Sequence, residues 1–233
     1  KRVENGLNDI GLTGRDIDAI LITHEHIDHI AGLGVLSRRY GIPIYTTEKT
    51  ADAIQETKSV GKIPEELFHP VCAEEAFTIK DLTVNPMRIS HDAADPVGYR
   101  FSYGSSHAAV CTDLGTYNDY TVECLKGMDV LLLEANHDVN MLQVGSYPYY
   151  LKQRILGNRG HLSNENSGRL LSRVLHDNLK KVILGHLSQE NNLPELAYET
   201  VRMEIDLADN PYHGGDFPIQ VAKRNEVSEM ICF

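Results

Sequence analysis

The sequence predicts an α/β fold of four layers, an αββα sandwich in which two sheets are covered by helices. The first observation is that apolar and polar residues alternate in segments 77–89, 97–103 and 107–112, as in antiparallel strands that follow one another in a meander. The second is a change after residue 116, where helical spacing and short apolar runs alternate. Strands covered by helices, with polar loops collected at one edge, favour a layered arrangement.

The first third of the chain is expected to contain short helices and strands. Val3, Leu7 and Ile10 have helical spacing. The apolar run at residues 18–23 (DAILIT) is typical of a buried strand that ends at a polar loop. The following elements are expected to be a helix over residues 30–40, a strand over 43–45, a helix over 47–57 begun by a threonine cap, and a loop over 61–70.

The second half is expected to alternate regularly between helices and strands. Helices are expected over residues 119–126, 149–156, 164–175 and 193–207, and strands over 129–133 and 181–184. No linker rich in Pro, Gly or Ser divides the sequence. Its 233 residues, 42% of them hydrophobic, suffice for one substantial core. We therefore expect a single domain over residues 1–233.

The cysteines and apolar runs limit the class of protein. The four cysteines form no CxxC pair and are too few for a disulfide scaffold, so we expect reduced thiols, as in a cytoplasmic protein. No apolar run approaches the roughly 18 residues that a membrane span needs, and no leader is recognisable. We expect a cytoplasmic protein with no membrane partner, and the sequence leaves its oligomeric state open.

Charge is distributed unevenly along the chain. The net charge is −11, which on average repels the phosphates of nucleic acids. Residues 152–181, here called the basic segment, instead carry +5, because seven basic residues outnumber Glu165 and Asp177 (Lys152, Arg154, Arg159, Arg169, Arg173, Lys180, Lys181). This count is compatible with a substrate-binding face and with a merely solvated surface.

Four potential metal ligands lie together directly after the first expected strand. His24, His26, Asp28 and His29 form the pattern HxHxDH, on a loop where alternate side chains can converge on one side. Imidazoles bind Zn, Fe, Mn or Co, and the Asp28 carboxylate can complete the shell of a second, adjacent ion. Solvated histidines seldom cluster in this way, so the pattern predicts a metal-binding loop.

Further ligands are expected from distant loops, because one short loop cannot surround two ions. His91, Asp113 and His186 each follow an apolar strand. Taken alone, each is more typical of a cap or surface residue. Their shared position at strand ends favours a common site.

At this point the residues carry a resemblance. HxHxDH followed by single His, Asp and His at strand ends resembles the metallo-β-lactamase superfamily over essentially the whole chain. The strings THEHIDHIAGLGVL, SHDAADPVGY, LLLEANHDVNML, RGHLSNENSG and LGHLSQENN are similar to the YycJ/WalJ family, proposed to be DNA exonucleases. The resemblance implies opening strands before residue 3, so N-terminal strands are expected to be missing. It also implies ligands for one ion (His24, His26, His91), for the other (Asp28, His29, His186), and a bridge, Asp113.

His161 is the remaining informative residue of the basic segment. It precedes a helix start at Ser163 and Asn164, where free backbone N–H groups are expected to seat a phosphate. Arg159 and Arg169 are expected to add positive charge for substrate binding.

The string Gly160-His161-Leu162-Ser163 also resembles the Gly-His-Ser-Thr motif of ribonuclease Z. That resemblance implies that His161 donates a proton and that Glu134, which ends an earlier strand, supports it. The alternative for Glu134 is a capping or structural carboxylate.

The resemblance implies a metal-dependent hydrolase that holds two divalent ions, Zn or Mn, with Fe as a further option. Two ions about 3.5–4 Å apart would activate a bridging hydroxide for in-line displacement at phosphorus, with Asp28 orienting it. The expected substrate is a phosphodiester, and a nucleic-acid strand is the best candidate. One alternative is a thioesterase, lactonase or β-lactamase, because the superfamily shares its metal shell. Another is a regulatory metal-binding protein, against which the intact ligand set argues.

Overall fold

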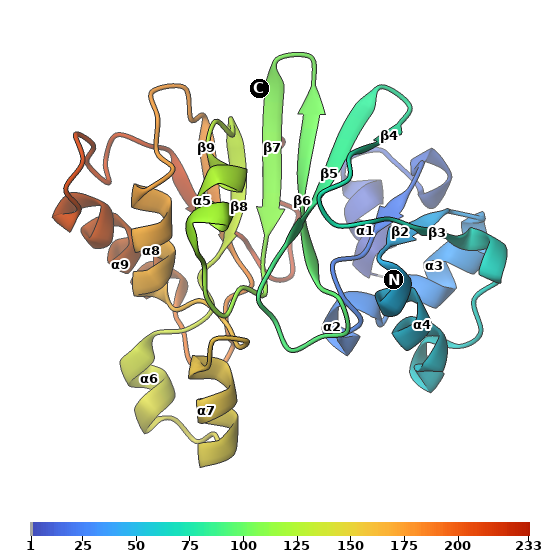
Figure 1. Cartoon of the computed structure of the whole chain (residues 1–233), viewed down its shortest axis with the longest axis horizontal. Helices are drawn as coiled ribbons and strands as arrows, with labels where there is room; N and C mark the ends of the chain where they lie inside the picture. Colours follow the sequence, from blue (N-terminus) through green and yellow to red (C-terminus); the bar gives the residue numbers. More distant parts are fainter. Residues whose placement is uncertain (1) are drawn as a thin grey trace. The chain divides into compact units, whose positions relative to one another are not determined.

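The computed structural model describes residues 2–233 and contains two compact units whose residues interleave along the chain. The first unit comprises residues 2–88, 93–97 and 223–229, and the second comprises residues 89–92, 98–222 and 230–233. Figure 1 gives the order of the helices and strands along the chain. Within residues 2–233, no helix combines the length and apolar character that crossing a membrane requires.

The first unit is built around a parallel sheet of three short strands. Its elements are α1 (Arg2–Asp9), β1 (Ile20–Leu21), α2 (Ile27–Ile30), α3 (Leu33–Tyr40), β2 (Ile44–Thr46), α4 (Glu48–Glu56), β3 (Phe68–Pro70), β4 (Phe77–Ile79), β5 (Leu82–Arg88) and three single 3-10 turns (Gly14–Asp16, Lys58–Val60, Glu65–Leu67). The sheet has the order β1-β2-β3, and β4 and β5 form an antiparallel hairpin. Ile22 and Ile44 pack with Ile30, Leu33 and Ile54 from the three helices α2, α3 and α4, so burial of this apolar cluster holds the helices on the sheet.

Three expectations for the first unit need correction. The helix expected over residues 30–40 is two helices, because the chain breaks at Ala31 and Gly32. Thr47 precedes α4 as expected, but its hydroxyl does not cap the helix and donates instead to the carbonyl of Asp95 at 2.9 Å. The loop expected over residues 61–70 ends in β3, which pairs with β2. β3 is specified by its contact with β2, and a strand of three residues is too short to show a periodic pattern in the sequence.

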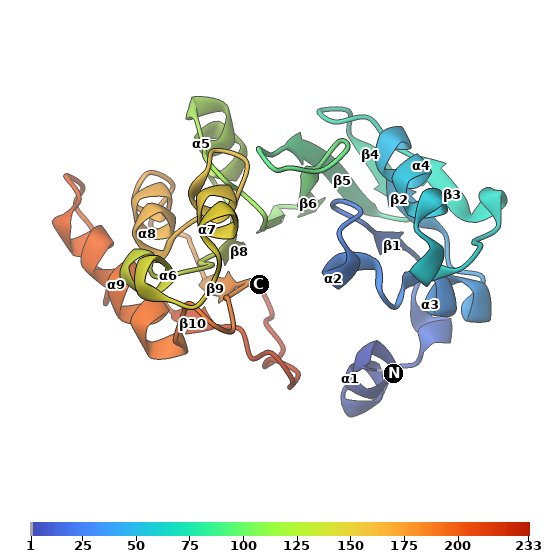
Figure 2. The same cartoon turned by 90° about the horizontal axis from the view of Figure 1, so that it is seen from below.

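The second unit is built around a sheet of five strands. Its elements are β6 (Val97–Tyr103), β7 (Ser106–Cys111), α5 (Asp119–Leu125), β8 (Val130–Glu134), α6 (Val139–Val144), α7 (Tyr149–Leu156), α8 (Asn164–Ser172), β9 (Lys181–Gly185), α9 (Pro194–Leu207) and β10 (Ile219–Val221). These strands lie in the order β6-β7-β8-β9-β10. β6 runs antiparallel to β7, and β7 to β10 are parallel. Figure 2 shows α5, α8 and α9 along one face of this sheet.

Most expected elements of the second unit are confirmed to within about two residues, and the expected hairpins are present, β6–β7 in this unit and β4–β5 in the first unit. The helix expected over residues 164–175 is shorter and ends at Ser172. Two elements were not expected from the sequence. α6 has only six residues and is begun by the Asp138 carboxylate, which accepts the Met141 N–H at 2.7 Å. β10 has three residues and is specified by its pairing with β9.

The parallel strands determine where polar side chains collect. Because β7, β8 and β9 are parallel, their carboxyl ends meet at one edge of the sheet. Asp113 follows β7, Glu134 ends β8 and His186 follows β9. Figure 1 shows α6 and α7 beyond this same edge, outside the layer that the other helices form.

Candidate active site

The HxHxDH loop of the first unit gathers three imidazoles. The loop connects β1 to α2, and the ring centroid of His24 lies 4.6 Å from that of His26 and 4.2 Å from that of His29. His24 is fully buried, with the Thr23 hydroxyl 3.0 Å from its Nδ1. Asp28 lies in the first turn of α2 and its side chain is largely exposed, 3.5 Å from the His29 ring. We call these four residues, His24, His26, Asp28 and His29, the first cluster.

Glu25, a residue that the sequence analysis did not single out, supports this loop. Its Oε1 accepts a hydrogen bond from the N–H of Ala94 at 2.8 Å, and the N–H of Val97 donates to the carbonyl of Thr23 at 3.0 Å. These bonds join the loop to residues 93–97 of the same unit. The only sequence signal for this role of Glu25 is that it is an acidic residue between two candidate ligands, His24 and His26.

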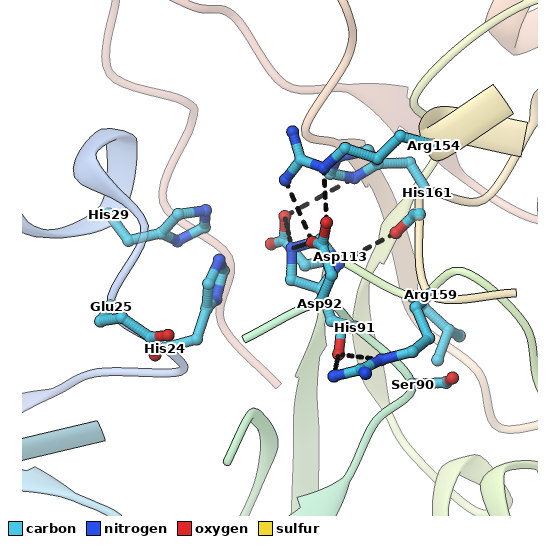
Figure 3. Close-up of polar contacts among 12 residues, drawn as sticks. His24, Glu25, His29, Ser90, His91, Asp92, Asp113, Arg154, Arg159 and His161 are labelled. Atoms are coloured by element: carbon cyan, nitrogen blue, oxygen red, sulfur yellow. Dashed lines mark hydrogen bonds and ion pairs between the residues drawn. The ribbon is translucent and has the colours of Figure 1, made fainter. Parts of the chain in front are cut away.

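The second unit places four further titratable side chains around Asp113, and Figure 3 shows His91, Asp113 and His161 turned toward one another. Asp113 Oδ1 lies 3.8 Å from His91 Nε2, 3.7 Å from His161 Nδ1 and 3.5 Å from His186 Nδ1. One donor atom each from Asp113, Glu134, His161 and His186 lies within 4.8 Å of the others. We call His91, Asp113, Glu134, His161 and His186 the second cluster.

Two residues of the second cluster have an unusual backbone conformation. Asp113 has a φ of 60° and His186 a φ of 57°, in the left-handed region that costs a residue with a side chain about 1–2 kcal/mol. Both residues lie directly after parallel strands, where the chain turns out of the sheet. Such strain persists only where the surrounding structure fixes it, and it is concentrated at functional sites.

Glu134 connects the histidines of the second cluster. The carboxylate is fully buried, and its Oε1 accepts a hydrogen bond from Nδ1 of His161 and from Nδ1 of His186, each at 2.8 Å. Its Oε2 accepts the backbone N–H groups of Leu114 at 2.7 Å and Leu162 at 3.1 Å. Burial alone raises the pKa of this carboxyl, but the hydrogen bonds from the two histidines outweigh burial and lower the pKa to about 2.

These bonds determine what the two rings can do. A neutral imidazole that donates from Nδ1 carries its lone pair on Nε2. A buried carboxylate behind the ring is the usual way in which proteins fix the tautomer and orientation of a metal-ligating histidine. The bonds to Glu134 therefore place the lone pair of neutral His161 and His186 on Nε2, the nitrogen that can bind a metal ion or take part in proton transfer.

His91 is held in the same way by backbone groups. Its Nδ1 donates to the carbonyl of Gly160 at 2.9 Å, and its own carbonyl accepts the Arg159 guanidinium at 3.1 and 3.0 Å. Burial lowers the pKa of His91. A side chain at Gly160 would lie 2.1 Å from the carbonyl oxygen of Ile155, so only glycine lets the chain pass this close. The bond from Nδ1 fixes the orientation of the ring, with Nε2 at 3.8 Å from Oδ1 of Asp113.

The expected phosphate seat at the start of α8 lies among hydrogen bonds within the fold. The N–H of Asn164 donates to the carbonyl of His137 at 2.9 Å, and the N–H of Asn166 donates to Oγ of Ser163 at 3.3 Å. The Asn164 side chain is fully buried and donates to Asn192 at 2.9 Å. These donors bond within the fold, so Ser163 and Asn164 stabilise the helix start, and their role in binding a phosphate stays a prediction.

The basic segment is less positive at its surface than its count of charges predicts. Arg169 pairs with Glu204 at 3.0 Å, on the side of α8 that faces α9. Three further cations of the segment also have carboxylate partners (Arg154 with Asp92 at 2.5 Å, Arg173 with Asp119 at 2.7 Å, Lys180 with Asp129 at 3.2 Å). Exposed pairs of this kind contribute little stability, but they balance charge locally. Arg159 differs, because its hydrogen-bond acceptor is a neutral carbonyl.

The near-identical strings HLSNEN and HLSQEN have a shared structural meaning that the sequence did not reveal. In both, the histidine donates to Glu134 and the serine two residues later accepts a backbone N–H, from Asn166 in one string and from Asn191 in the other. The chain after β8 lies between the two, because the N–H of Asn136 donates to Leu162 and the carbonyl of Asn136 accepts the N–H of Ser188. The two strings therefore hold two equivalent histidines on either side of one carboxylate.

Buried asparagines complete this arrangement. The Asn136 side chain donates to the carbonyl of His186 at 2.9 Å. Nδ2 of Asn192 donates to the carbonyls of Ala135 and Asn136 at 2.9 and 3.1 Å, and its amide is joined to that of Asn164. Because buried amides without partners are costly, this network fixes the backbone at the carboxyl ends of β8 and β9.

His137 provides a prediction about acid stability. The ring is 1% exposed, and burial lowers its pKa from 6.5 to about 4. A group whose folded pKa is lowered contributes stability above its unfolded pKa, and that contribution is lost as the pH falls from 6.5 toward 4. A pKa shift of this size corresponds to about 3 kcal/mol of unfolding free energy.

In chelator-treated protein we therefore expect His137→Gln to lose less unfolding free energy than the unsubstituted chain between pH 7 and pH 4.5, as measured by urea denaturation. Parallel losses in both proteins would contradict this assignment.

Comparison with known proteins identifies the fold of this chain and its family. The family model described as "Beta-lactamase superfamily domain" matches residues 8–186. The crystal structure of the metallo-beta-lactamase fold protein YhfI from Bacillus subtilis superposes with a TM-score of 0.64 over 93% of this chain and 78% of that chain, at 16% identity. The expected α/β sandwich of the metallo-β-lactamase fold is thereby confirmed.

Two relatives are considerably more similar in sequence. The exodeoxyribonuclease WalJ of Streptococcus pneumoniae is 42% identical over 209 residues, which cover 90% of this chain and 78% of WalJ. The exodeoxyribonuclease YycJ of Bacillus anthracis is 39% identical over 191 residues, which cover 82% of this chain and 72% of YycJ. The chain therefore belongs to the beta-lactamase superfamily and, within it, to the family of WalJ and YycJ.

Proposed function

We propose that this protein is a metal-dependent exonuclease that hydrolyses phosphodiester bonds in DNA. The names of two relatives at 42% and 39% identity support this activity. The observation that carries the proposal is the Glu134 carboxylate, which orients His161 and His186 through Nδ1 beside Asp113. Oriented imidazoles and a buried carboxylate around one point are what hydrolysis of a phosphodiester with bound divalent ions requires.

The donors of both clusters suit divalent metal ions. Imidazoles that are oriented through Nδ1, as in His91, His161 and His186, together with a buried Asp carboxylate, are ligands typical of Zn or Mn, with Fe as a further option. We propose two ions per chain, with the ligands His24, His26, Asp28, His29, His91, Asp113 and His186. Bound divalent ions lower the pKa of water and polarise phosphoryl oxygens.

The remaining roles belong to side chains of the protein. We propose that Asp28, exposed at the start of α2, orients the attacking water by accepting a hydrogen bond. When both of its ring nitrogens carry hydrogen, His161 donates the Nε2 proton to the leaving oxygen, and the ionised Glu134 at 2.8 Å from Nδ1 balances the positive charge of the ring before transfer. Arg159 holds the His91 backbone and keeps a positive charge beside the cluster for a substrate phosphate.

Removal and return of metal tests this function. We expect protein treated with a chelator to leave end-labelled DNA intact, and added Mn or Zn to restore stepwise degradation from an end. The panel should contain single-stranded and duplex DNA, an RNA strand, a simple phosphodiester and a thioester. Hydrolysis of the thioester but of no phosphodiester would make the protein a small-molecule hydrolase. Metal binding without any hydrolysis would favour a regulatory role.

A further inference from the structure

The turn and helix after α6 expose aromatic side chains to solvent. Tyr149 is 76% exposed and Tyr150 is 75% exposed, and Val144 at the end of α6 is 86% exposed. Large aromatic side chains usually bury most of their surface. Two neighbouring tyrosines that remain in water at the start of α7 are therefore a feature that folding alone does not explain. We call Tyr149 and Tyr150 the tyrosine face.

The tyrosine face is held by the fold rather than by a mobile loop. α7 buries Ile155, while Tyr149 and Tyr150 are exposed, as is Gln153 about one helical turn further along. Nζ of Lys152 donates to the carbonyls of Gln143 and Gly145, each at 2.7 Å. These bonds tie α7 to the end of α6 and fix the turn between them. The aromatic rings are thus presented by a preorganised support.

The charge around the tyrosine face favours a polyanion. Residues 139–160 contain Lys152, Arg154 and Arg159 and no acidic residue, in a chain with a net charge of −11. Arg154 is balanced by Asp92. Lys152 and Arg159 instead donate to backbone carbonyls, which are neutral, so their positive charges remain available to phosphates.

The same segment is attached directly to the second cluster. Arg154 pairs with Asp92, and Arg159 donates to the carbonyl of His91. The carbonyl of Gly160 accepts from His91 Nδ1. Figure 3 shows both arginines reaching the His91 and Asp92 backbone and side chains. The segment that carries the tyrosine face is therefore joined to His91 of the second cluster within the same unit.

We propose that Tyr149 and Tyr150 stack on bases of a single-stranded DNA end, while Lys152 and Arg159 attract its backbone. The inference rests on the proposed function and names the form of its substrate. Proteins that hold single strands combine cationic grooves with aromatic rings that stack on successive bases. Unpaired bases offer open faces, whereas bases inside a duplex are already stacked on one another. The tyrosine face therefore selects an unpaired end.

Substitution of both tyrosines tests the inference. We expect Tyr149→Ala with Tyr150→Ala to raise the KM for a short single-stranded oligonucleotide about tenfold or more, and to leave the hydrolysis of a simple phosphodiester unchanged. Tyr149→Phe with Tyr150→Phe should retain the low KM, because phenylalanine also stacks. The matched control is Tyr103→Ala, a tyrosine 60% exposed on the β6–β7 hairpin, which should change neither value.

A second measurement locates the contact itself. An oligonucleotide with 5-iodouracil near its end should photocrosslink to the tyrosine face, and mapped peptides should contain Tyr149 or Tyr150. If the unsubstituted protein degrades DNA but the alanine variant keeps its KM, the inference fails while the proposed function stands. If the protein hydrolyses no DNA, the proposed function fails, and absence of oligonucleotide binding and crosslinking would remove the inference too. A change of oligomeric state in the alanine variant with unchanged KM would assign the surface to contact between copies of the chain.

Discussion

Replacement of Asp113 by alanine is expected to lower DNA hydrolysis by more than about 100-fold. Loss of a residue that only hydrogen-bonds a metal ligand already lowers activity or metal affinity about 10–100-fold, and loss of a ligand itself should cost more. Asp113 is 1% exposed and has polar contacts to three histidines of the second cluster. Its carboxylate is one of the proposed metal ligands. Elemental analysis after metal loading should find two ions in the unsubstituted chain and fewer in the variant.

The control for Asp113→Ala is Asp119→Ala. Asp119 lies in the same unit, its side chain is 89% exposed, and its only role in the described contacts is an ion pair with Arg173 at the surface. That variant should keep full activity and metal content. If Asp113→Ala retained both ions and its activity, the proposed ligand set would be wrong. A stoichiometry of one ion in the unsubstituted chain would overturn the two-metal proposal alone.

Substitution of Glu134 by alanine is expected to have the largest effect on stability. The carboxylate is fully buried and accepts hydrogen bonds from two histidines and from the N–H groups of Leu114 and Leu162. Alanine would leave all four donors inside the protein without an acceptor. Removing one partner from a buried charged network costs about 3–5 kcal/mol, so urea denaturation should show a loss of this order.

Glu134→Gln should separate the structural role from the chemical one. Its amide oxygen can still accept the N–H groups of Leu114 and Leu162, but its NH₂ group then faces Nδ1 of His161 and His186. The rings can accept from this NH₂ only if they carry their hydrogens on Nε2. We expect most of the stability to remain, and metal affinity and activity to fall about 10–100-fold.

The matched control is Glu123→Gln, because the Glu123 side chain is 67% exposed and forms a surface ion pair with Lys126. It should leave metal affinity and stability unchanged. Equal metal affinity in Glu134→Gln and in the unsubstituted chain would show that the tautomer argument is wrong.

Local sequence signals determined the elements and the candidate ligands. Period-two alternation located β6, and helical spacing located α7. Asp113 and His186 each follow an apolar run that is typical of a buried strand, so the sequence also indicated that they lie at strand ends. His24, His26, Asp28 and His29 form a single local pattern, which is recognisable without any tertiary information.

Only the tertiary structure decided the partners of these side chains. Glu134 accepts from two histidines 27 and 52 residues away, and Arg169 is committed to Glu204, 35 residues away. The short strands β3 and β10 exist because β2 and β9 offer them backbone partners. Periodicity reports which face of an element is apolar, whereas hydrogen-bond partners far apart in sequence are chosen by distance and burial in the folded chain. For this reason the ligand types could be predicted from the sequence, and the network that orients them could not.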